Sequence, residues 1–298
     1  MYKKISVVIP CYNSFEFIEK TLTSIVSQQY PNLELIIVDG GSTDGTLEII
    51  KKFDKYIDVL ISEEDNGQYD AVRKGLAESK GDILCWLNSD DIYMPWTFEL
   101  VNNFFINNEG FMWISGSSLL IDEKGVPMFT SHNISSKNSK DIKKGLFRKN
   151  YLGYLQQEGM FWKKELYDIS EGLSLNYSLA ADFELWTKFA RIAEVVSVSA
   201  PLAGFRIQKH NRSIVLSEKY EQEVKEIIDL INKNKLINKI FNPNKLFSII
   251  FRALKWRKSY IYSYSLILKK WTLSMNRLPV FLNTISQLIF EINSIKKK

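Results

Sequence analysis

Short apolar runs alternate with amphipathic stretches over the first ninety residues. The runs at 5–9, 35–38, 57–61 and 83–87 are rich in Ile, Leu and Val, a pattern typical of buried parallel strands. The stretches at 14–29, 42–53 and 69–77 repeat apolar residues at helical spacing, and Ser14 is expected to cap the first helix. This alternation predicts an α/β fold with a mostly parallel sheet, right-handed crossovers and flanking helices.

Polar residues follow the carboxyl end of each predicted strand. They occupy positions 10–13, 39–42, 63–68 and 88–91. Ligands of open α/β sheets bind outside the carboxyl ends of the strands, so these four segments are expected to share one site. The glycine patterns of dinucleotide-binding loops and of P-loops do not follow the first strand. We therefore expect a metal ion, and not a glycine loop, to neutralise a bound diphosphate.

Asp90 and Asp91 give the sharpest of these signals. Adjacent carboxylates repel each other unless a cation or hydrogen-bond donors neutralise them. A hard divalent cation shared with a diphosphate would do so, which predicts Mg²⁺ or Mn²⁺ at Asp90 and Asp91. On local sequence alone, an alternative is that Asp91 caps the next helix while Asp90 is solvated.

Composition sets the broad class of protein. The chain has 298 residues, of which 45% are hydrophobic and 24% charged, as in ordinary soluble globular proteins. Cys11 and Cys85 both lie in apolar runs and are interpreted as free thiols of a reducing compartment. The apolar part of the amino end is too short for a signal peptide, so a cytoplasmic protein is expected.

A second acidic candidate lies in the less regular part of the chain. Asp182 precedes an apolar helical stripe that includes Phe183, Trp186 and Phe189, so it falls at the amino end of a helix with one buried face. Taken alone, it is better explained as an ordinary helix cap.

Three segments together resemble the signature segments of family 2 glycosyltransferases of the GT-A fold, of the kind that act in bacterial surface-polysaccharide synthesis. These segments are 6–13, 37–46 and 81–91, and their spacing also fits. The resemblance covers about residues 4–95 and continues more weakly to about 213. It implies a nucleotide-sugar-binding half at 1–95 and an acceptor-binding half of the same GT-A domain at 96–215.

The resemblance also implies roles for individual positions. Asn88 stands where the family usually has the first acid of its Asp-x-Asp motif and would face the ribose, beside Ser89. Asp90 matches the metal-binding acid, and Asp182 matches the catalytic base. The residues implied for the nucleotide-base pocket are Pro10, Tyr12, Asp39, Gln68 and Asp70.

Several of these positions have a simpler interpretation. Tyr12 could be a rim aromatic, and Asp39 with Asp44 could stabilise a turn. Asn88 removes one negative charge near the expected metal. In the family, a basic or His-bearing segment closes over the diphosphate, and Arg206 or His210 could serve here, although a lone His is more often structural.

The carboxyl-terminal part, 216–298, is predicted to be a basic amphipathic helical extension. From 240 to 298 there are eleven Lys or Arg against one acid, whereas the rest of the chain is net negative. Apolar residues repeat at helical spacing at 246–254 and 281–292, with Trp and Tyr residues between. Such helices bind anionic membrane surfaces, so we expect a peripheral protein at the inner face of the cell membrane, with residues 240–298 in contact. The alternatives are a packed helical subdomain or a homodimer contact; no nucleic-acid recognition motif accompanies the charge.

The function implied is that of an inverting glycosyltransferase. It would move a sugar from a nucleotide-sugar, most simply a UDP-sugar, to a hydroxyl of a lipid-linked saccharide by single displacement. Two alternatives stay open: a nucleotidyltransferase, and a non-catalytic nucleotide-sugar-binding protein that the Asn88 departure would favour.

Overall fold

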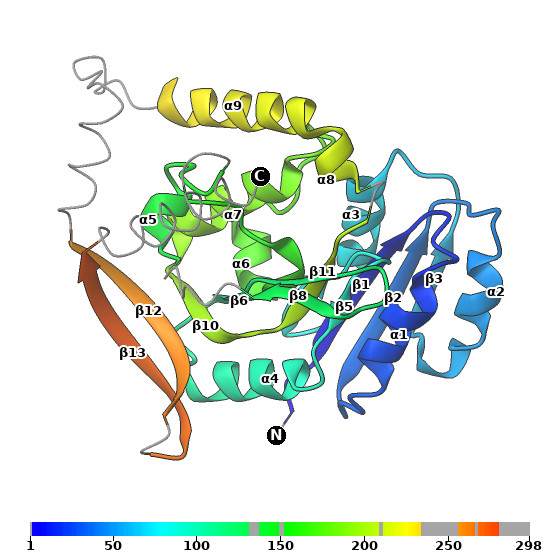
Figure 1. Ribbon diagram of the computed structural model, residues 1–298, viewed down its shortest axis with the longest axis horizontal. Helices are drawn as coiled ribbons and strands as arrows, with labels where there is room; N and C mark the ends of the chain where they lie inside the picture. The colour runs from blue at the N-terminus through cyan, green and yellow to red at the C-terminus, as the bar shows by residue number, and fades with distance from the viewer. Residues whose placement is uncertain are drawn as a thin grey trace.

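The computed structural model describes residues 2–130, 137–148, 152–208, 211–233, 256–265 and 268–279 (Figure 1). Within them, one mixed sheet has the order β13-β12-β10-β6-β9-β4-β1-β2-β3. Its strands are β1 (Ile5–Cys11), β2 (Leu33–Asp39), β3 (Val59–Ser62), β4 (Ile83–Trp86), β6 (Trp113–Ser117), β9 (Met160–Lys163), β10 (Val195–Pro201), β12 (Trp256–Ser265) and β13 (Lys270–Pro279). β1 pairs in parallel with β2 and β4, and β9 runs antiparallel between β4 and β6. The predicted α/β fold with a mostly parallel sheet is confirmed.

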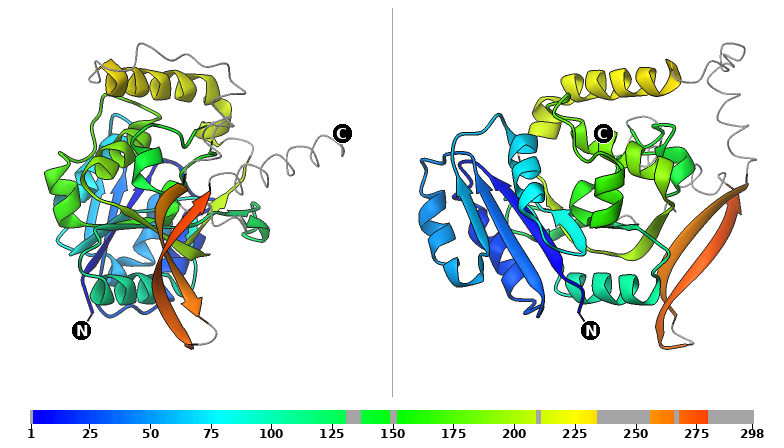
Figure 2. Two further views of the ribbon diagram at one scale, coloured as in Figure 1. Left: turned by 90° about the vertical axis from the view of Figure 1, so that its left-hand side faces the viewer. Right: turned by 180° about the vertical axis from the view of Figure 1, so that it is seen from behind.

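Helices pack around this sheet, and the hairpin of β12 and β13 lies at the edge opposite β3 (Figures 1 and 2). The helices are α1 (Ile18–Val26), α2 (Thr46–Lys51), α3 (Gln68–Glu78), α4 (Thr97–Asn107), α5 (Ser139–Ile142), α6 (Lys164–Ile169), α7 (Ala181–Ile192), α8 (Arg212–Val215) and α9 (Ser217–Lys233), with short 3-10 turns η1 (Asp54–Tyr56) and η2 (Gln157–Gly159). In Figure 1, α9 crosses the top of the molecule above α6 and α7. The first helix begins later than predicted. Ser14 accepts the N–H groups of Phe17 and Ile18 with its backbone carbonyl, so its predicted side-chain cap is wrong.

β1 is the centre of the donor-side core. Every residue of this strand is buried, because β2 and β4 flank it and helices cover its faces. α3 approaches β1 closely at Gly75, where an added Cβ would lie 2.4 Å from a methyl carbon of Val8. The glycine therefore sets how near α3, which begins at Gln68, lies to the strands that border the site.

A second, smaller sheet has the order β5-β11-β7-β8, formed by β5 (Ile92–Tyr93), β7 (Leu119–Ile121), β8 (Pro127–Thr130) and β11 (Ala203–Arg206). β7 and β8 form an antiparallel hairpin around 122–125. β11 pairs with β5, directly after the 88–91 segment, and with β7. This sheet brings the end of β11 against the two adjacent acids.

The carboxyl-terminal part differs from the predicted helical extension. α9 is helical, but 256–265 and 270–279 are strands, and β12 extends the main sheet by pairing in parallel with β10. Tyr260 and Tyr262 follow the two-residue period of a strand and pack on Phe111 and Phe104, at ring distances of 4.9 and 5.0 Å. The helical prediction is therefore wrong at 256–265 and 270–279, where these two tyrosines contact Phe111 and Phe104.

The amphipathic helices predicted at 246–254 and 281–292 lie outside the described residues. α9, the last helix among the described residues, ends at Lys233. Within the ranges that the structure describes, none of the helices combines the length and the apolar character required to cross a bilayer.

Candidate active site

The carboxyl ends of β1 and β4 border a cavity of about 1240 Å³. β2 and β3 continue the sheet on one side of β1, and β4 lies on its other side, so the strand order reverses between β1 and β4. Such a reversal leaves a crevice in which open α/β sheets bind ligands. The predicted site residues that line it are Pro10, Tyr12, Gln68, Asn88, Ser89, Asp90 and Asp182.

The segment after β4 turns its two acids in different directions. Asp90 lines the cavity and accepts a hydrogen bond from the side-chain amide of Gln208. Asp91 is fully buried, and its carboxylate accepts the backbone N–H of Arg206 at 2.8 Å. Burial, then the neighbouring charges of Asp90 and Glu158, raise the pKa of Asp91 well above its usual value. Asp91 does not line the cavity, so this geometry supports Asp90 alone as a metal ligand.

Arg206 holds this segment in place. Its Nε donates to the backbone carbonyl of Asp90, and its Nη1 donates to the carbonyls of Asp122 and Glu123 at 3.0 and 2.8 Å. The guanidinium also lies over the ring of Phe17, 5.0 Å from its centroid. Arg206 is fully buried and does not line the cavity, so the prediction that it closes over a diphosphate is wrong in this geometry. The other candidate for that role, His210, lies outside the described residues.

Asp182 lies in the first turn of α7 and lines the same cavity. Its carboxylate accepts the N–H of Phe183 at 2.7 Å and lies 3.0 Å from the hydroxyl of Tyr69. Burial raises the pKa of Asp182 to about 6, although these two hydrogen bonds oppose the shift. A carboxylate of that pKa is basic enough to accept a proton near neutral pH while remaining mostly ionised there.

The loop that leads into α7 is held by Glu223 of α9. Its carboxylate accepts the N–H groups of Leu179 and Ala180 at 2.8 and 2.9 Å, and both the N–H and the hydroxyl of Ser178. Burial opposes ionisation, but these bonds keep the pKa of Glu223 below its usual value. Sequence reasoning missed Glu223 because an acid on an amphipathic helix is usually solvated. The sequence feature that could have indicated its burial is its position next to Val224, an apolar residue of α9 that is buried.

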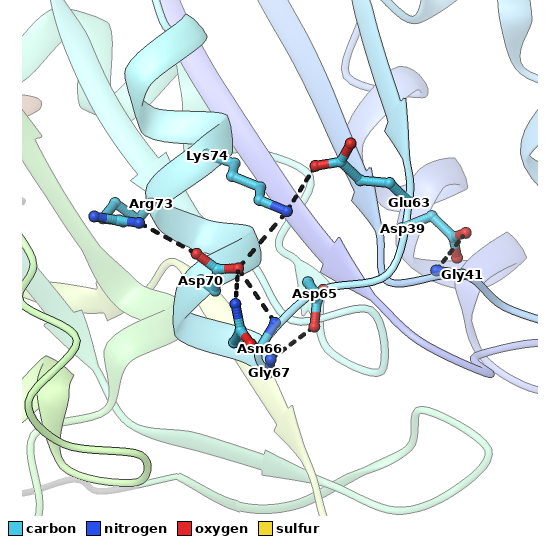
Figure 3. Close-up of polar contacts among 9 residues, drawn as sticks. All are labelled: Asp39, Gly41, Glu63, Asp65, Asn66, Gly67, Asp70, Arg73 and Lys74. Carbon is cyan, nitrogen blue, oxygen red and sulfur yellow. Dashed lines mark hydrogen bonds and ion pairs between the residues drawn. The ribbon is translucent and has the colours of Figure 1, made fainter.

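Asp39 is occupied within its own loop and does not line the cavity. Its buried carboxylate accepts the N–H of Gly41 at 3.2 Å (Figure 3). It also accepts the N–H of Ser42 at 3.1 Å and the hydroxyl of Ser62 at 2.9 Å. The simpler interpretation, a turn-stabilising acid, describes these contacts.

Asp70 is similarly occupied. It accepts the backbone N–H and the side-chain amide of Asn66, and it forms ion pairs with Arg73 at 3.4 Å and Lys74 at 3.6 Å (Figure 3). Arg73 therefore has a structural partner in Asp70. Asp70 is buried and does not line the cavity, so it shapes the loop before α3 instead of contacting a ligand.

Gln68 contacts both Asn88, after β4, and Arg212 of α8. Its amide nitrogen donates to the Asn88 side-chain carbonyl at 2.6 Å, and its carbonyl oxygen is 3.4 Å from a guanidinium nitrogen of Arg212. Arg212 also lines the cavity and was not among the predicted site residues. Its position two residues beyond His210, in a polar stretch, gave little to separate it from a solvated arginine.

Comparison with known proteins decides the family. The family model described as Glycosyl transferase family 2 matches residues 6–160, which is just over half of the chain. The chain belongs to glycosyl transferase family 2. The recognition made from the three signature segments is confirmed.

Relatives of this family 2 protein extend over most of its length. An uncharacterized glycosyltransferase of Haemophilus influenzae is 24% identical over 91% of this chain and 88% of its own. TuaG of Bacillus subtilis, named as a teichuronic acid biosynthesis glycosyltransferase, is 34% identical over 42% of this chain and 50% of its own.

Two solved structures share the fold of this family 2 protein. S. aureus TarS 1-349, in complex with UDP-GlcNAc, superposes with a TM-score of 0.60 at 19% identity, over 80% of this chain and 68% of that one. The mannosyltransferase PcManGT of Pyrobaculum calidifontis, in complex with GDP-Man and Mn²⁺, gives 0.54 at 20% identity, over 76% and 65%.

The acids of the cavity fit a divalent cation only in part. Among the described residues, no group of three or more carboxylate, His or Cys side chains could enclose a metal ion. Asp90 nevertheless presents a hard oxygen ligand at the cavity wall. Mg²⁺ is commonly bound by one or two carboxylates together with substrate phosphates and water. This donor set therefore fits a cation that binds together with a diphosphate better than one held by the protein alone.

Proposed function

We propose that this protein is an inverting glycosyltransferase that moves a sugar from a UDP-sugar to a hydroxyl of a saccharide acceptor. The observation that carries the proposal is that Asp90 and Asp182 line the same cavity. The cavity draws its lining from both 1–95 and 96–215, the proposed donor and acceptor halves, with α9 adding Ser217 and Tyr220.

The donor would lie along the ends of β1 and β4. The base and ribose would be bordered by Pro10, Tyr12, Gln68 and Asn88, and the diphosphate by Ser89 and Asp90. Tyr12 is 63% exposed, which leaves its ring free to stack on a base. TarS binds UDP and UDP-GlcNAc, and PcManGT binds GDP-Man with Mn²⁺, which supports a nucleotide-sugar in this position.

Asp90 would hold Mg²⁺ or Mn²⁺, which supplies positive charge to the leaving diphosphate when bound. The protein itself keeps Asp90 oriented through Gln208 and through the carbonyl that Arg206 binds. Because the 88–91 segment is also held by the Thr21 hydroxyl, at 2.8 and 2.7 Å from the carbonyls of Ser89 and Asp91, its geometry is fixed before a ligand enters.

Asp182 would act as the base. Its carboxylate takes the proton of the acceptor hydroxyl as that oxygen bonds to the anomeric carbon. The bond from that carbon to the diphosphate oxygen breaks, and the nucleoside diphosphate departs with the electron pair. Attack from the face opposite the leaving group inverts the configuration.

The acceptor would be a lipid-linked saccharide, as in cell-surface polysaccharide synthesis. The support is the excess of eleven Lys or Arg over one acid at 240–298, which favours an anionic membrane surface at the inner face of the cell membrane. The name of TuaG points to the same kind of polymer.

Fluorescence titration tests the donor proposal, because Trp86 lines the cavity and reports on its occupancy. UDP, GDP and dTDP are titrated with Mn²⁺ and with EDTA against the wild type, Asp90→Ala and the control Glu63→Gln, which removes an acid outside the lining. We expect UDP binding that requires Mn²⁺, is lost in Asp90→Ala and persists in the control. Absence of binding by all three nucleotides would overturn the proposal.

A further inference from the structure

Glu158 is a cavity acid to which neither the mechanism nor the family resemblance gives a role. It lies in η2, the turn before β9, and its side chain is 3% exposed while it lines the cavity. The neighbouring Gln157 fixes this turn by donating from its side chain to the carbonyl of Trp86 at 2.6 Å. Glu158 is thus held rigidly beside the end of β4.

One carboxyl oxygen of Glu158 is buried and has no hydrogen-bond partner in the part of the chain that the structure describes. Leaving a buried polar atom unpaired costs about 1–3 kcal/mol, so such an atom at a cavity wall calls for a ligand as its partner. Among the described residues, no hydrogen bond joins this oxygen to the nearby Lys137, whose amine donates to the Ser115 hydroxyl and the Gly116 carbonyl, both at 2.6 Å.

Glu158 lies within electrostatic reach of both functional acids. Burial raises its pKa to about 8, and the charges of Asp182 and Asp90 contribute to that rise. Asp90 borders the proposed diphosphate and Asp182 the acceptor hydroxyl. The transferred sugar must lie between them, because its anomeric carbon is bonded to the diphosphate and is attacked by the acceptor.

The charge of the cavity restricts which sugar fits there. The acids of its lining are Glu16, Glu64, Asp65, Asp90, Glu158 and Asp182. Among the described residues, Arg212 is the one cationic side chain of that lining, and it is directed to Gln68. With a pKa of about 8, the Glu158 carboxyl is mostly protonated near neutral pH and can donate a hydrogen bond to a neutral sugar. A carboxylate on the sugar would instead meet the ionised Asp182 without a cationic partner, and like charges brought together cost several kcal/mol.

We propose that Glu158 hydrogen-bonds a hydroxyl or amide of the transferred sugar and that this sugar is an uncharged hexose or N-acetylhexosamine, not a hexuronic acid. This inference rests on the proposed function. It adds a specificity-determining residue and a substrate class to the same site.

Calorimetric titration in the presence of Mn²⁺ tests it with UDP, UDP-glucose, UDP-galactose, UDP-N-acetylglucosamine and UDP-glucuronate. The variants are Glu158→Gln, Glu158→Ala and Glu158→Met, and Glu63→Gln is the control for loss of an acid outside the lining. Glu158→Met keeps the side-chain volume and decides the result if Glu158→Ala does not fold.

We expect every variant to bind UDP as the wild type does. The best neutral UDP-sugar should bind about five- to twentyfold more weakly to Glu158→Ala and Glu158→Met, and within about threefold of wild type to Glu158→Gln, whose amide keeps a donor and an acceptor. The wild type should bind UDP-glucuronate at least about tenfold more weakly than it binds the best neutral UDP-sugar.

Two results would overturn the inference while leaving the proposed function intact. One is unchanged affinity of Glu158→Ala and Glu158→Met for all three neutral UDP-sugars. The other is wild-type affinity for UDP-glucuronate equal to that for the best neutral sugar. Failure of the wild type to bind UDP, GDP or dTDP is a different result, which overturns the proposed function itself.

Discussion

The hydroxyl of Tyr69 lies 3.0 Å from a carboxylate oxygen of Asp182 and an equal distance from the carbonyl of Leu179. Tyr69 follows Gln68 in the first turn of α3, so one helix end borders the donor pocket and orients the proposed base. A donor to the ionised carboxylate favours its charged form. Tyr69 therefore offsets part of the effect of burial on the pKa of Asp182.

Replacing Tyr69 by Phe should move the pH dependence of the reaction upward. Asp182 works as an anion, so the rate should rise with pH through its pKa of about 6 in the wild type. Without the hydroxyl, the pKa should rise by about 0.5–1 unit, and the acid limb should follow. The pH profile of donor hydrolysis measures this. An unchanged midpoint would show that Tyr69 does not act on Asp182.

Asp182→Asn should separate chemistry from donor binding. The amide cannot accept the acceptor proton, so the rate of sugar transfer or donor hydrolysis should fall by about 10²–10⁴-fold. UDP affinity should stay within about twofold, because the proposed role of Asp182 is to accept a proton and not to hold the nucleotide. Glu184→Gln is the matched control, since Glu184 pairs with Ser174 and Lys188 outside the lining. Comparable activity of both variants would exclude Asp182 as the base.

Glu223→Gln should loosen the loop that carries the base. The carboxylate accepts three backbone N–H groups and one hydroxyl, and the loss of charge-assisted bonds should lower the free energy of unfolding by about 1.5–3 kcal/mol. The turnover rate should fall more than UDP affinity does. Glu226→Gln, a substitution at an exposed position of the same helix, should change neither the free energy of unfolding nor the turnover rate. Urea denaturation and steady-state kinetics supply the two measurements, and equal stabilities of the two variants would refute the anchoring role.

Gly75→Ala should destabilise the donor half. The added methyl would lie 2.4 Å from Val8 and 3.1 Å from Val38, so α3 or the sheet must shift, at a cost of about 1–3 kcal/mol. Gly110→Ala is the control, because no atom lies within 4 Å of the Cβ added there. Thermal denaturation compares them, and a melting temperature of Gly75→Ala at or above that of Gly110→Ala would contradict the close approach.

Local patterns were sufficient to predict the sheet and the edge at which the site lies. The apolar runs of β1 and β4 predicted parallel strands, and polar residues that follow these strands line the cavity as expected. These features depend on neighbours in sequence. The period of apolar residues and the position of strand ends can therefore be read before folding is known.

The direction of each acid could not be predicted in the same way. Asp91 points inward because the N–H of Arg206, 115 residues away, meets its carboxylate. Asp39 is occupied partly by Ser62 of β3, the neighbouring strand in the sheet. Glu158 reaches the cavity through the fold of a turn whose sequence shows no motif. Each outcome depends on a contact between distant segments, which no local spacing encodes.

The β12–β13 hairpin belongs to the main sheet but contributes no described residue to the cavity lining. Every described residue that lines the cavity precedes 233, yet β12 covers the outer edge of β10 by pairing at Val196, Ser197 and Val198. A chain shortened after α9 would keep the whole cavity lining but leave the backbone groups of β10 open to pairing with other molecules. Such a fragment should aggregate on expression, and attempts to isolate a minimal enzyme should retain the residues up to 279.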